Sequence, residues 1–285
     1  MIGRRTFVLG AISAAGSGAC DRKAPEAKSG RRVAVAGGPI TEIVFALGAG
    51  GEVVGTDTSS TFPAPAAALP KFGYQRQLAA EGILSLTPGL FLASDEAGPP
   101  EVLEHLRQAG VRVATIGTPK EKAAIAKRVV DVGEAIGAAE AGKRLASELE
   151  TAIAGLTKRA EARSSRPRVL FLYARGQGTM MVGGRNTSAD LILELAGCTN
   201  AAAELSGFVP LTPEAAVASK AEVVLVPEKG LASLGGKTGL FATPGLAETP
   251  AAKGERAVAV DDLLLLGLGP RVAEAIDAVA AQVFV

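Results

Sequence analysis

The sequence predicts an α/β protein built from two lobes and a helical segment that joins them. Short apolar runs alternate with amphipathic stretches in residues 31–118 and again in residues 164–285. Such alternation is typical of parallel sheets covered by helices on both faces. Between these regions, residues 119–163 contain no strand signal and are rich in Ala, Glu, Lys and Leu. With 48% hydrophobic and 21% charged residues, the chain has enough apolar material for two cores.

Residues 1–30 have the features of an export signal followed by a polar tether. In "MIGRRTFVLGAISAAGSGAC", two arginines precede an apolar stretch from Phe7 to about Ala15, and small residues follow. The apolar stretch is shorter than the roughly 20 residues that span a bilayer, so we expect no membrane span in the mature chain. Arg4 and Arg5 resemble a twin-arginine signal, and an ordinary secretory signal is the alternative.

The chain has two cysteines, which cannot form a disulfide framework. Cys20 ends the stretch "SGAC", which resembles a lipoprotein processing site where the cysteine becomes lipidated. Ser17 departs from that pattern, because a larger aliphatic residue is usual there. A lipid anchor at Cys20 is therefore one of two open alternatives. Cys198 follows a predicted helix, and we expect a small buried apolar side chain there.

The first lobe begins with a predicted β-α-β unit. "RVAVAGG" predicts a buried strand, "PITEIVFALGAG" a helix closed by glycine, and "EVVGTD" a second strand. The helix-then-strand pattern repeats in "AEGILSL" with "GLFLAS", and again in "PPEVLEHLRQAG" with "VRVATI". Pro99 and Pro100 favour a helix start, and Gly110 favours a helix end.

The joining segment is predicted to form two helices that are separated at Gly137. The second helix, about residues 139–163, is long for a globular protein. At about 1.5 Å per residue it would span roughly 35 Å, which is the size of a domain.

The second lobe resumes the alternation of strands and helices. The predicted strands are "RVLFLYA", "EVVLVPE" and "RAVAVD", and the predicted helices are "TSADLILELAG", "PEAAVASK" and "PRVAEAIDAVAAQVF". Tyr173 ends the first of these strands and is expected in the core, with a place in a cleft as the alternative.

A weak internal repeat relates the two lobes. "EGILSLTPGLFLAS" aligns with "EAAVASKAEVVLVP", which places Glu81 over Glu214 and Leu92 over Leu225. Each copy reads as a short helix opened by glutamate and followed by a buried strand. Two such units are expected by chance in α/β proteins, so the repeat gives modest support for duplicated lobes.

The residue inventory argues against nucleic-acid binding and against catalysis. The formal net charge is +1, whereas nucleic-acid-binding proteins usually carry a basic bias. "AVAGGPITEI" places glycines after a strand but lacks the Gly-x-Gly-x-x-Gly spacing of a dinucleotide site. His105, the only histidine, falls on the solvent side of its predicted helix, and no cluster of His and Cys could hold a metal. An α/β enzyme is therefore the less favoured interpretation.

The stretch "KFGYQRQL", residues 71–78, contains a pair of side chains suited to binding iron. Tyr74 is one of only two tyrosines, and it precedes Arg76 by two positions in a loop-like segment. A phenolate is a hard anionic oxygen donor that suits ferric iron. A ferric centre and a nearby guanidinium both favour the phenolate over the phenol. From these residues alone, a turn tyrosine with an exposed hydroxyl is the alternative.

With these motifs, the chain resembles the periplasmic binding proteins of metal-chelate ABC importers, and among them the haem-binding subfamily. The resemblance covers essentially all of residues 31–285, and "GYQRQLAAEG" is its most specific part. It implies two Rossmann-like lobes joined by a long rigid helix, with haem in the cleft between them. It further implies a monomer in the periplasm that delivers haem to an inner-membrane permease dimer.

The resemblance also implies roles for particular residues. Tyr74 would ligate the haem iron, and Arg76 would supply positive charge beside it or pair with a propionate. Arg175, Arg185 and Arg271 are further propionate candidates, each with a solvated surface arginine as the alternative. Some relatives place a second iron-binding histidine near position 175, and its absence here favours one haem over two. A siderophore or cobalamin is the alternative ligand, and neither needs an iron-ligating tyrosine.

Two acidic residues match the positions through which related proteins dock onto their permease. Glu81 and Glu214 are equivalent in the internal repeat, and each stands in the first turn of a short predicted helix. The resemblance implies that each meets basic residues on one permease subunit. The alternative is that each carboxylate only complements the dipole of its own helix.

Overall fold

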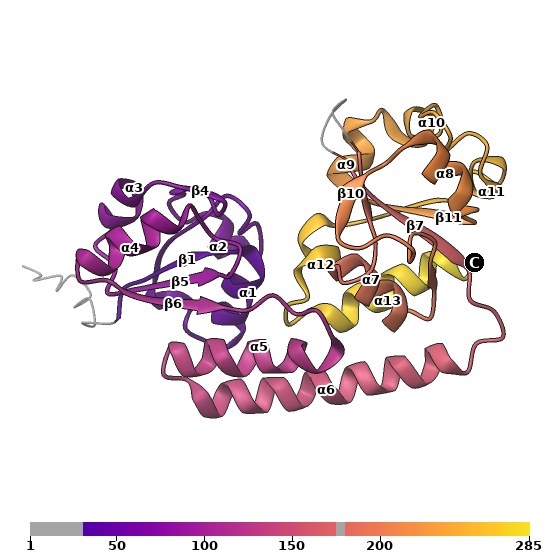
Figure 1. Ribbon diagram of the computed structural model, residues 1–285. Coiled ribbons are helices and arrows are strands. Elements are labelled where there is room, and N and C mark those ends of the chain that lie inside the picture. The colour runs from indigo at the N-terminus through magenta and orange to yellow at the C-terminus, as the bar shows by residue number, and fades with distance from the viewer. Residues whose placement is uncertain (1–30, 175–179) are drawn as a thin grey trace, which may run out of the picture. The chain divides into compact units, whose positions relative to one another are not determined.

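The computed structural model describes residues 31–174 and 180–285, which contain two main sheets and the helices that cover them (Figure 1). The first sheet is wholly parallel, with the strand order β2-β1-β5-β6. Its strands are β1 (Val33–Ala36), β2 (Val53–Thr56), β5 (Leu90–Ser94) and β6 (Arg112–Ile116). The four strands predicted in the first lobe are therefore confirmed, in one parallel sheet.

Short helices and one hairpin connect the strands of the first sheet. The predicted helices are present as α1 (Gly38–Ala46), α3 (Ala80–Leu84) and α4 (Pro100–Gln108). Three small features were not predicted: a 3-10 turn (Gly50–Glu52), α2 (Ala64–Ala67) and a hairpin of β3 (Gly73–Tyr74) and β4 (Gln77–Leu78).

Two helices follow the first sheet, as the sequence predicts. They are α5 (Lys122–Ala135) and α6 (Ala139–Glu161), and they pack against each other. Gly137 lies between them with a φ of 71°, a left-handed conformation that glycine adopts without steric cost. The 23 residues of α6 would extend about 34 Å at 1.5 Å per residue. The long joining helix is therefore confirmed.

The second sheet is mixed, which corrects the expectation of a parallel sheet. It has the order β10-β8-β7-β11-β12, with β9 beside β7. Its strands are β7 (Arg168–Tyr173), β8 (Met181–Gly183), β9 (Thr199–Asn200), β10 (Phe208–Pro210), β11 (Val223–Pro227) and β12 (Ala257–Val260). β7, β11 and β12 are parallel, whereas β8 runs antiparallel to both of its neighbours, β7 and β10. Only residues 174–180 separate β7 from β8, which is too short for a parallel crossover.

The helices of the second lobe include the three predicted ones, α7 (Ser188–Leu195), α8 (Pro213–Ser219) and α13 (Val272–Val283). Four further short helices were not predicted: α9 (Glu228–Ser233), α10 (Gly236–Phe241), α11 (Pro250–Lys253) and α12 (Asp262–Gly267). Thr187 caps the start of α7, because its side chain accepts a hydrogen bond of 3.1 Å from the backbone N–H of Asp190.

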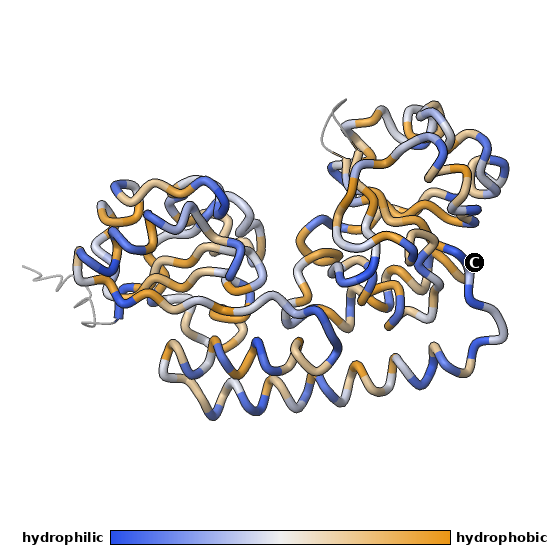
Figure 2. Tube along the Cα trace, viewed as in Figure 1, coloured by the Kyte–Doolittle hydropathy of each residue, from blue (hydrophilic) through white to orange (hydrophobic). Residues whose placement is uncertain are grey.

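Alternating side chains place each sheet between two apolar layers. In β1, Val33 and Val35 face one core, and Ala34 and Ala36 face another. Strand β7 alternates in the same way between two cores. This period of two follows from strand geometry, and burial on both faces explains why the strands are continuously apolar. The strands are accordingly among the most hydrophobic segments of the chain (Figure 2).

The joining helices extend one apolar core from the first sheet to the second. Ile125 and Val129 of α5 and Leu149 and Ile153 of α6 belong to the same cluster as buried residues of β1 and β7. Helix α5 also contacts α1 and β6, and α6 contacts α7 and α13. Residues 31–285 form one compact unit. The boundaries at residues 118 and 163 remain predictions. Among the described residues, no helix is both long and apolar enough to cross a membrane.

Candidate ligand-binding cleft

The principal candidate site is a cavity of about 730 Å³ that is lined by residues of both lobes and of α5. Tyr74, Arg76 and Glu96 line it from the first lobe, and Tyr173, Phe208 and Lys229 line it from the second. Pockets of about 300–1,000 Å³ hold small ligands and cofactors. The mixture of aromatic, apolar and charged walls suits a flat organic ligand that carries charged groups.

The hairpin β3–β4 holds Tyr74 at the cavity wall. Gly73 has a φ of 109°, a conformation that side chains other than glycine rarely adopt, and this lets the chain turn just before Tyr74. In the hairpin Gly73 pairs with Leu78, and Tyr74 pairs with Gln77. The stretch predicted to be a loop is therefore a short, hydrogen-bonded hairpin with Arg76 in its turn.

Buried residues on both sides anchor this hairpin. Phe72, just before the hairpin, and Leu78, its last residue, belong to the core under the first sheet, where Phe72 packs edge-on against Phe91 with ring centroids 6.0 Å apart. The Gly73 carbonyl accepts a hydrogen bond of 2.8 Å from the Thr58 N–H, and the Leu78 N–H donates one of 2.8 Å to the Gly98 carbonyl. Tyr74 is therefore carried by backbone that is fixed at both ends.

Lys71 ties the start of this segment to the neighbouring loop. Its Nζ donates hydrogen bonds to Thr56 Oγ1 at 2.7 Å, to the Ser60 carbonyl at 2.8 Å and to the Ala66 carbonyl at 3.0 Å. Burial lowers the pKa of Lys71, and the nearby Asp57 carboxylate opposes that shift. All three hydrogen bonds of the ammonium group are made to protein, so Lys71 acts as a positioning residue for the hairpin.

Tyr74, Arg76 and Glu96 form a charged group at the cavity wall. Arg76 Nη1 donates to Tyr74 Oη at 3.3 Å, and Arg76 Nη2 forms an ion pair with Glu96. Partial burial disfavours the charge of Arg76, but Glu96 and Tyr74 together raise its pKa. The Arg76 guanidinium is thus a permanent positive charge beside the phenol oxygen, and it can stabilise an anionic phenolate there.

Two of the other predicted propionate candidates, Arg185 and Arg271, do not line the cavity. Arg185 is exposed and does not line the cavity. Arg271 forms an ion pair with the buried Glu42 and stacks over the ring of Phe62 at 3.7 Å, and it does not line the cavity either. Arg175 lies outside the described residues, as do Cys20 and the whole export signal.

Two cations of the cavity were missed by the sequence reasoning, namely Arg128 and Lys229. A signal for Arg128 was present: it stands three residues after Ile125 and four before Val132, on the apolar stripe of α5. A charged residue on a buried stripe indicates either a structural partner or a site. Lys229 lies in α9, a helix too short to have a clear periodic pattern.

The second lobe contributes aromatic and thioether side chains to the cavity. Tyr173 at the end of β7 is half-buried: it packs against the main core, as the sequence favoured, and it also lines the cavity, which was the alternative. Tyr173 is the last residue of β7, so its side chain lies at the carboxyl end of this strand, beside the cavity. Met181 and Phe208, on the adjacent strands β8 and β10, also line the cavity.

The two glutamates considered for docking lie in equivalent places. Glu81 is exposed in the first turn of α3, which precedes β5, and Glu214 is exposed in the first turn of α8, which precedes β11. Hydrogen bonds from its own backbone N–H and from Thr212 lower the pKa of Glu214. Neither glutamate lines the cavity.

The remaining candidates for chemistry are not at the cavity. His105 is exposed on α4, as the sequence predicts. Cys198 is buried, also as predicted, and burial raises the pKa of its thiol to about 11. Within residues 31–174 and 180–285, no group of three or more His, Cys, Asp or Glu side chains could hold a metal ion.

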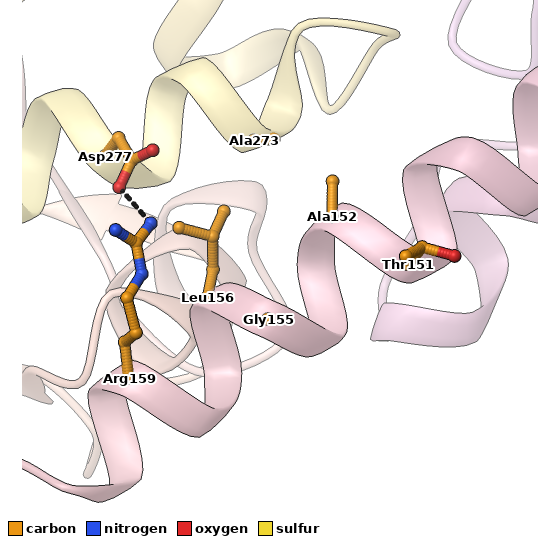
Figure 3. A pocket seen from close by; sticks show the side chains of 7 residues that line it. All are labelled: Thr151, Ala152, Gly155, Leu156, Arg159, Ala273 and Asp277. Carbon is orange, nitrogen blue, oxygen red and sulfur yellow. Dashed lines mark hydrogen bonds and ion pairs between the residues drawn. The ribbon is translucent and has the colours of Figure 1, made fainter.

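A second hollow, of about 410 Å³, lies between α6 and α13. Figure 3 shows Arg159 of α6 reaching toward Asp277 of α13, with Leu156 beside them. The Arg159 Nη2 donates to Asp277 Oδ1 at 2.7 Å, so these two charges satisfy each other. This hollow is smaller than the cavity beside Tyr74, and its only charged lining residues are this pair.

Comparisons with known proteins agree with this architecture. The curated relative YvrC of Bacillus subtilis (strain 168), described as an uncharacterized ABC transporter substrate-binding lipoprotein, is 27% identical over 86% of this chain and 77% of its own. The periplasmic haem-binding protein RhuT from Roseiflexus sp. RS-1, solved in apo form, is 44% identical, with a TM-score of 0.86 over 89% of this chain and 97% of its own.

A further solved relative is the periplasmic haem-binding protein BhuT in complex with two haems. It is 38% identical, with a TM-score of 0.83 over 89% of this chain and 97% of its own. The family model described as "Periplasmic binding protein" matches residues 33–263. Because that match covers well over half of the sequence, the chain belongs to this periplasmic binding protein family.

Proposed function

We propose that the protein captures haem and delivers it to an ABC permease of the inner membrane. One observation carries the proposal: Tyr74 is held on an anchored hairpin at the wall of a 730 Å³ cavity, with the Arg76 guanidinium 3.3 Å from its phenol oxygen. This arrangement matches the chemistry of a ferric-iron ligand. The haem-binding relatives, one of them 44% identical, support the same ligand.

The cavity offers suitable surroundings for each part of a haem. Tyr74 would supply an anionic oxygen to ferric iron on one side. Phe208 and Met181 would pack against the apolar porphyrin ring from the second lobe. Among the predicted arginines, Arg76 is the propionate candidate that the cavity geometry favours. Arg185 and Arg271 are less favoured, because neither lines the cavity.

We expect one haem per chain. The described residues place a single tyrosine on the hairpin side of the cavity, and the sequence has no histidine near Arg175 to ligate a second iron. The relative BhuT was solved with two haems, so two is the competing stoichiometry for this site.

A titration of the purified protein with ferric haem tests both statements. Visible absorption should develop high-spin tyrosinate-type bands that saturate at one equivalent. Saturation at two equivalents would contradict the single-haem proposal. If haem caused no spectral change while cobalamin or a ferric siderophore bound tightly, that compound would be the ligand in place of haem.

The rest of the chain fits a role outside the cytoplasm. We propose export through the signal in residues 1–30, with the twin-arginine route suggested by Arg4 and Arg5, and a lipid anchor at Cys20. The protein would act as a monomer and would dock on a permease dimer through Glu81 and Glu214. We expect neither catalysis nor nucleic-acid binding. Mass spectrometry of the mature protein tests the anchor, since lipidation would make Cys20 the modified first residue.

A further inference from the structure

Arg128 is a buried arginine at the cavity wall formed by α5. Its side chain is almost fully buried, at 4% relative exposure, and it lines the same cavity as Tyr74 and Arg76. It occupies the apolar stripe of α5 with Ile125, Val129 and Val132, where an aliphatic residue would be expected. Burying a guanidinium without a counter-charge is costly, so its presence on this stripe requires a cause.

The described neighbours of Arg128 satisfy only part of its hydrogen-bonding capacity. Arg128 Nη1 donates to the neutral carbonyl oxygen of Gly267 at 2.9 Å. Its Nε–H has no hydrogen-bond partner among the described residues. A guanidinium carries five N–H donors, so this side chain retains donors for a further acceptor.

The two carboxylates that act on the charge of Arg128 are already engaged with other groups. Asp95 and Glu96 are the acidic groups that stabilise the charge of Arg128 through space. Asp95 accepts hydrogen bonds from the N–H and hydroxyl of Thr118, at 3.1 Å and 2.6 Å. Glu96 pairs with Arg76. Burial accordingly lowers the pKa of Arg128 to about 10, which still leaves it charged at neutral pH.

We propose that Arg128 receives a carboxylate of the ligand at the α5 wall of the cavity. The inference rests on the proposed function, and for haem the group is one of the two propionates. A carboxylate accepts two parallel hydrogen bonds from a guanidinium and supplies the missing counter-charge. Tyr74 would then bind the iron, and Arg128 would bind a carboxylate at the edge of the chelate.

A purely structural role for Arg128 makes a different prediction. The Gly267 carbonyl lies at the end of α12, where carbonyl groups lack helical partners, and Arg128 caps it. If capping were the whole role, loss of Arg128 would lower stability and would weaken every ligand alike, whether or not that ligand carries a carboxylate.

The test compares ferric haem with its dimethyl ester, which keeps the iron and ring but has no free carboxylate. Affinities are measured by absorption for the wild type, Arg128→Gln and Arg128→Lys. We expect Arg128→Gln to weaken haem binding roughly ten- to hundredfold, the usual effect of losing a charged hydrogen bond. Its affinity for the diester should stay within about threefold of the wild type. Arg128→Lys keeps the positive charge but lacks the two parallel N–H donors of the guanidinium. Its affinity for haem should therefore lie between those of the wild type and Arg128→Gln.

Arg144→Gln is the matched control, because Arg144 is an exposed arginine on α6 and does not line the cavity. Its affinities for both ligands should equal those of the wild type.

Equal losses of affinity for haem and for the diester in both Arg128 variants, or no loss for either ligand, would overturn the inference while leaving haem binding intact. Failure of the wild type to bind either form would overturn the proposed function and this inference together. Thermal melts identify a variant that fails to fold, and Arg128→Lys then decides the result.

Discussion

At the scale of single residues, the proposal depends most on the oxygen atom of Tyr74. Replacing Tyr74 with Phe keeps the ring and removes only the proposed iron ligand. We expect Tyr74→Phe to weaken ferric haem binding by at least about a hundredfold, because a direct ligand should matter more than the outer partners whose loss costs about 10–100-fold. The tyrosinate bands should disappear, and Tyr74→Ala should behave almost identically.

His105→Ala is the control for this comparison. His105 is the only histidine of the chain, and it is exposed on α4 away from the cavity. The variant should bind haem with wild-type affinity and an unchanged spectrum. A wild-type spectrum in Tyr74→Phe would mean that another residue ligates the iron.

Cys198 is expected to be inert in the folded protein. Burial raises the pKa of its thiol to about 11, and only the thiolate is nucleophilic. In a Cys20→Ser background, Cys198 is the sole thiol. A disulfide-exchange reagent at about pH 8 should therefore react at least about 100-fold more slowly with the native protein than with the denatured protein. Comparable rates would show that the site opens readily.

Sequence reasoning found the residues that a short local motif defines. Tyr74 and Arg76 stand two positions apart, and the structure brings both to the cavity. Arg128 and Lys229 reach that cavity from distant helices, so their proximity depends on the packing of the two lobes. Arg271 was a candidate for binding a propionate, but in the structure it pairs with the buried Glu42, which is 229 positions away in the sequence. No pattern within a single segment reveals such a pairing.

At the scale of elements, the Glu42–Arg271 pair links α1 to the start of α13. Glu42 is buried, and its pKa is raised chiefly by burial, against the opposing effect of Arg271. Arg271→Met removes the partner and leaves the carboxyl buried alone. We expect a loss of about 3 kcal/mol in the free energy of unfolding near neutral pH. Denaturant titrations of the variant and the wild type measure this difference.

The same variant should also change the pH dependence of stability. A carboxyl with a raised pKa binds its proton more tightly in the folded chain than in the unfolded chain. Its favourable contribution is therefore full below the unfolded pKa and declines as pH rises through the folded pKa. Without Arg271 the pKa of Glu42 should rise further, so more stability should be lost as pH rises from below the unfolded pKa through the folded pKa. Adding Glu42→Gln should abolish the extra slope, and a slope unchanged by Arg271→Met would contradict this explanation.

Strands and helices differ in how well the sequence predicted them. The continuously apolar strands such as β1 and β11 and the periodic helix α6 were predicted because burial and amphipathicity leave clear patterns. Strands β8 and β10 have three residues each, and the hairpin strands have two, which is too short for any periodicity. These short elements form part of the cavity, so the parts of the fold nearest the site were the hardest to predict.

At the scale of the whole molecule, each lobe contains the same unit, a short helix followed by a buried strand. We propose that these two units face the permease. Leu92 is the third residue of β5 and Leu225 is the third residue of β11, and both face the core that α5 and α6 extend between the sheets. The helices before these strands carry Glu81 and Glu214. The internal repeat of the sequence is thus reproduced in the structure as two equivalent surface carboxylates.

We predict that reversing both charges, in Glu81→Lys with Glu214→Lys, uncouples haem delivery from haem binding. Neither side chain lines the cavity, so haem affinity should stay within about twofold of the wild type. Delivery to the reconstituted permease should fall at least about tenfold, because charges at the rim of an interface control encounter and orientation. Uptake of haem into proteoliposomes measures delivery, and its loss should be greatest at low salt.

Glu101→Lys with Glu140→Lys separates docking from helix stability. These glutamates are also exposed in first turns, of α4 and α6, so their reversal carries the same kind of helix-dipole cost. Glu140 also loses an ion pair with Lys143, which is exposed and therefore contributes little to stability. The two double variants should therefore lose similar stability, while only the Glu81 and Glu214 variant loses transport. If both variants delivered haem at the wild-type rate, Glu81 and Glu214 would retain only their role at the helix ends. If both lost delivery equally, the effect would come from overall surface charge, because each double variant changes the net charge by the same amount.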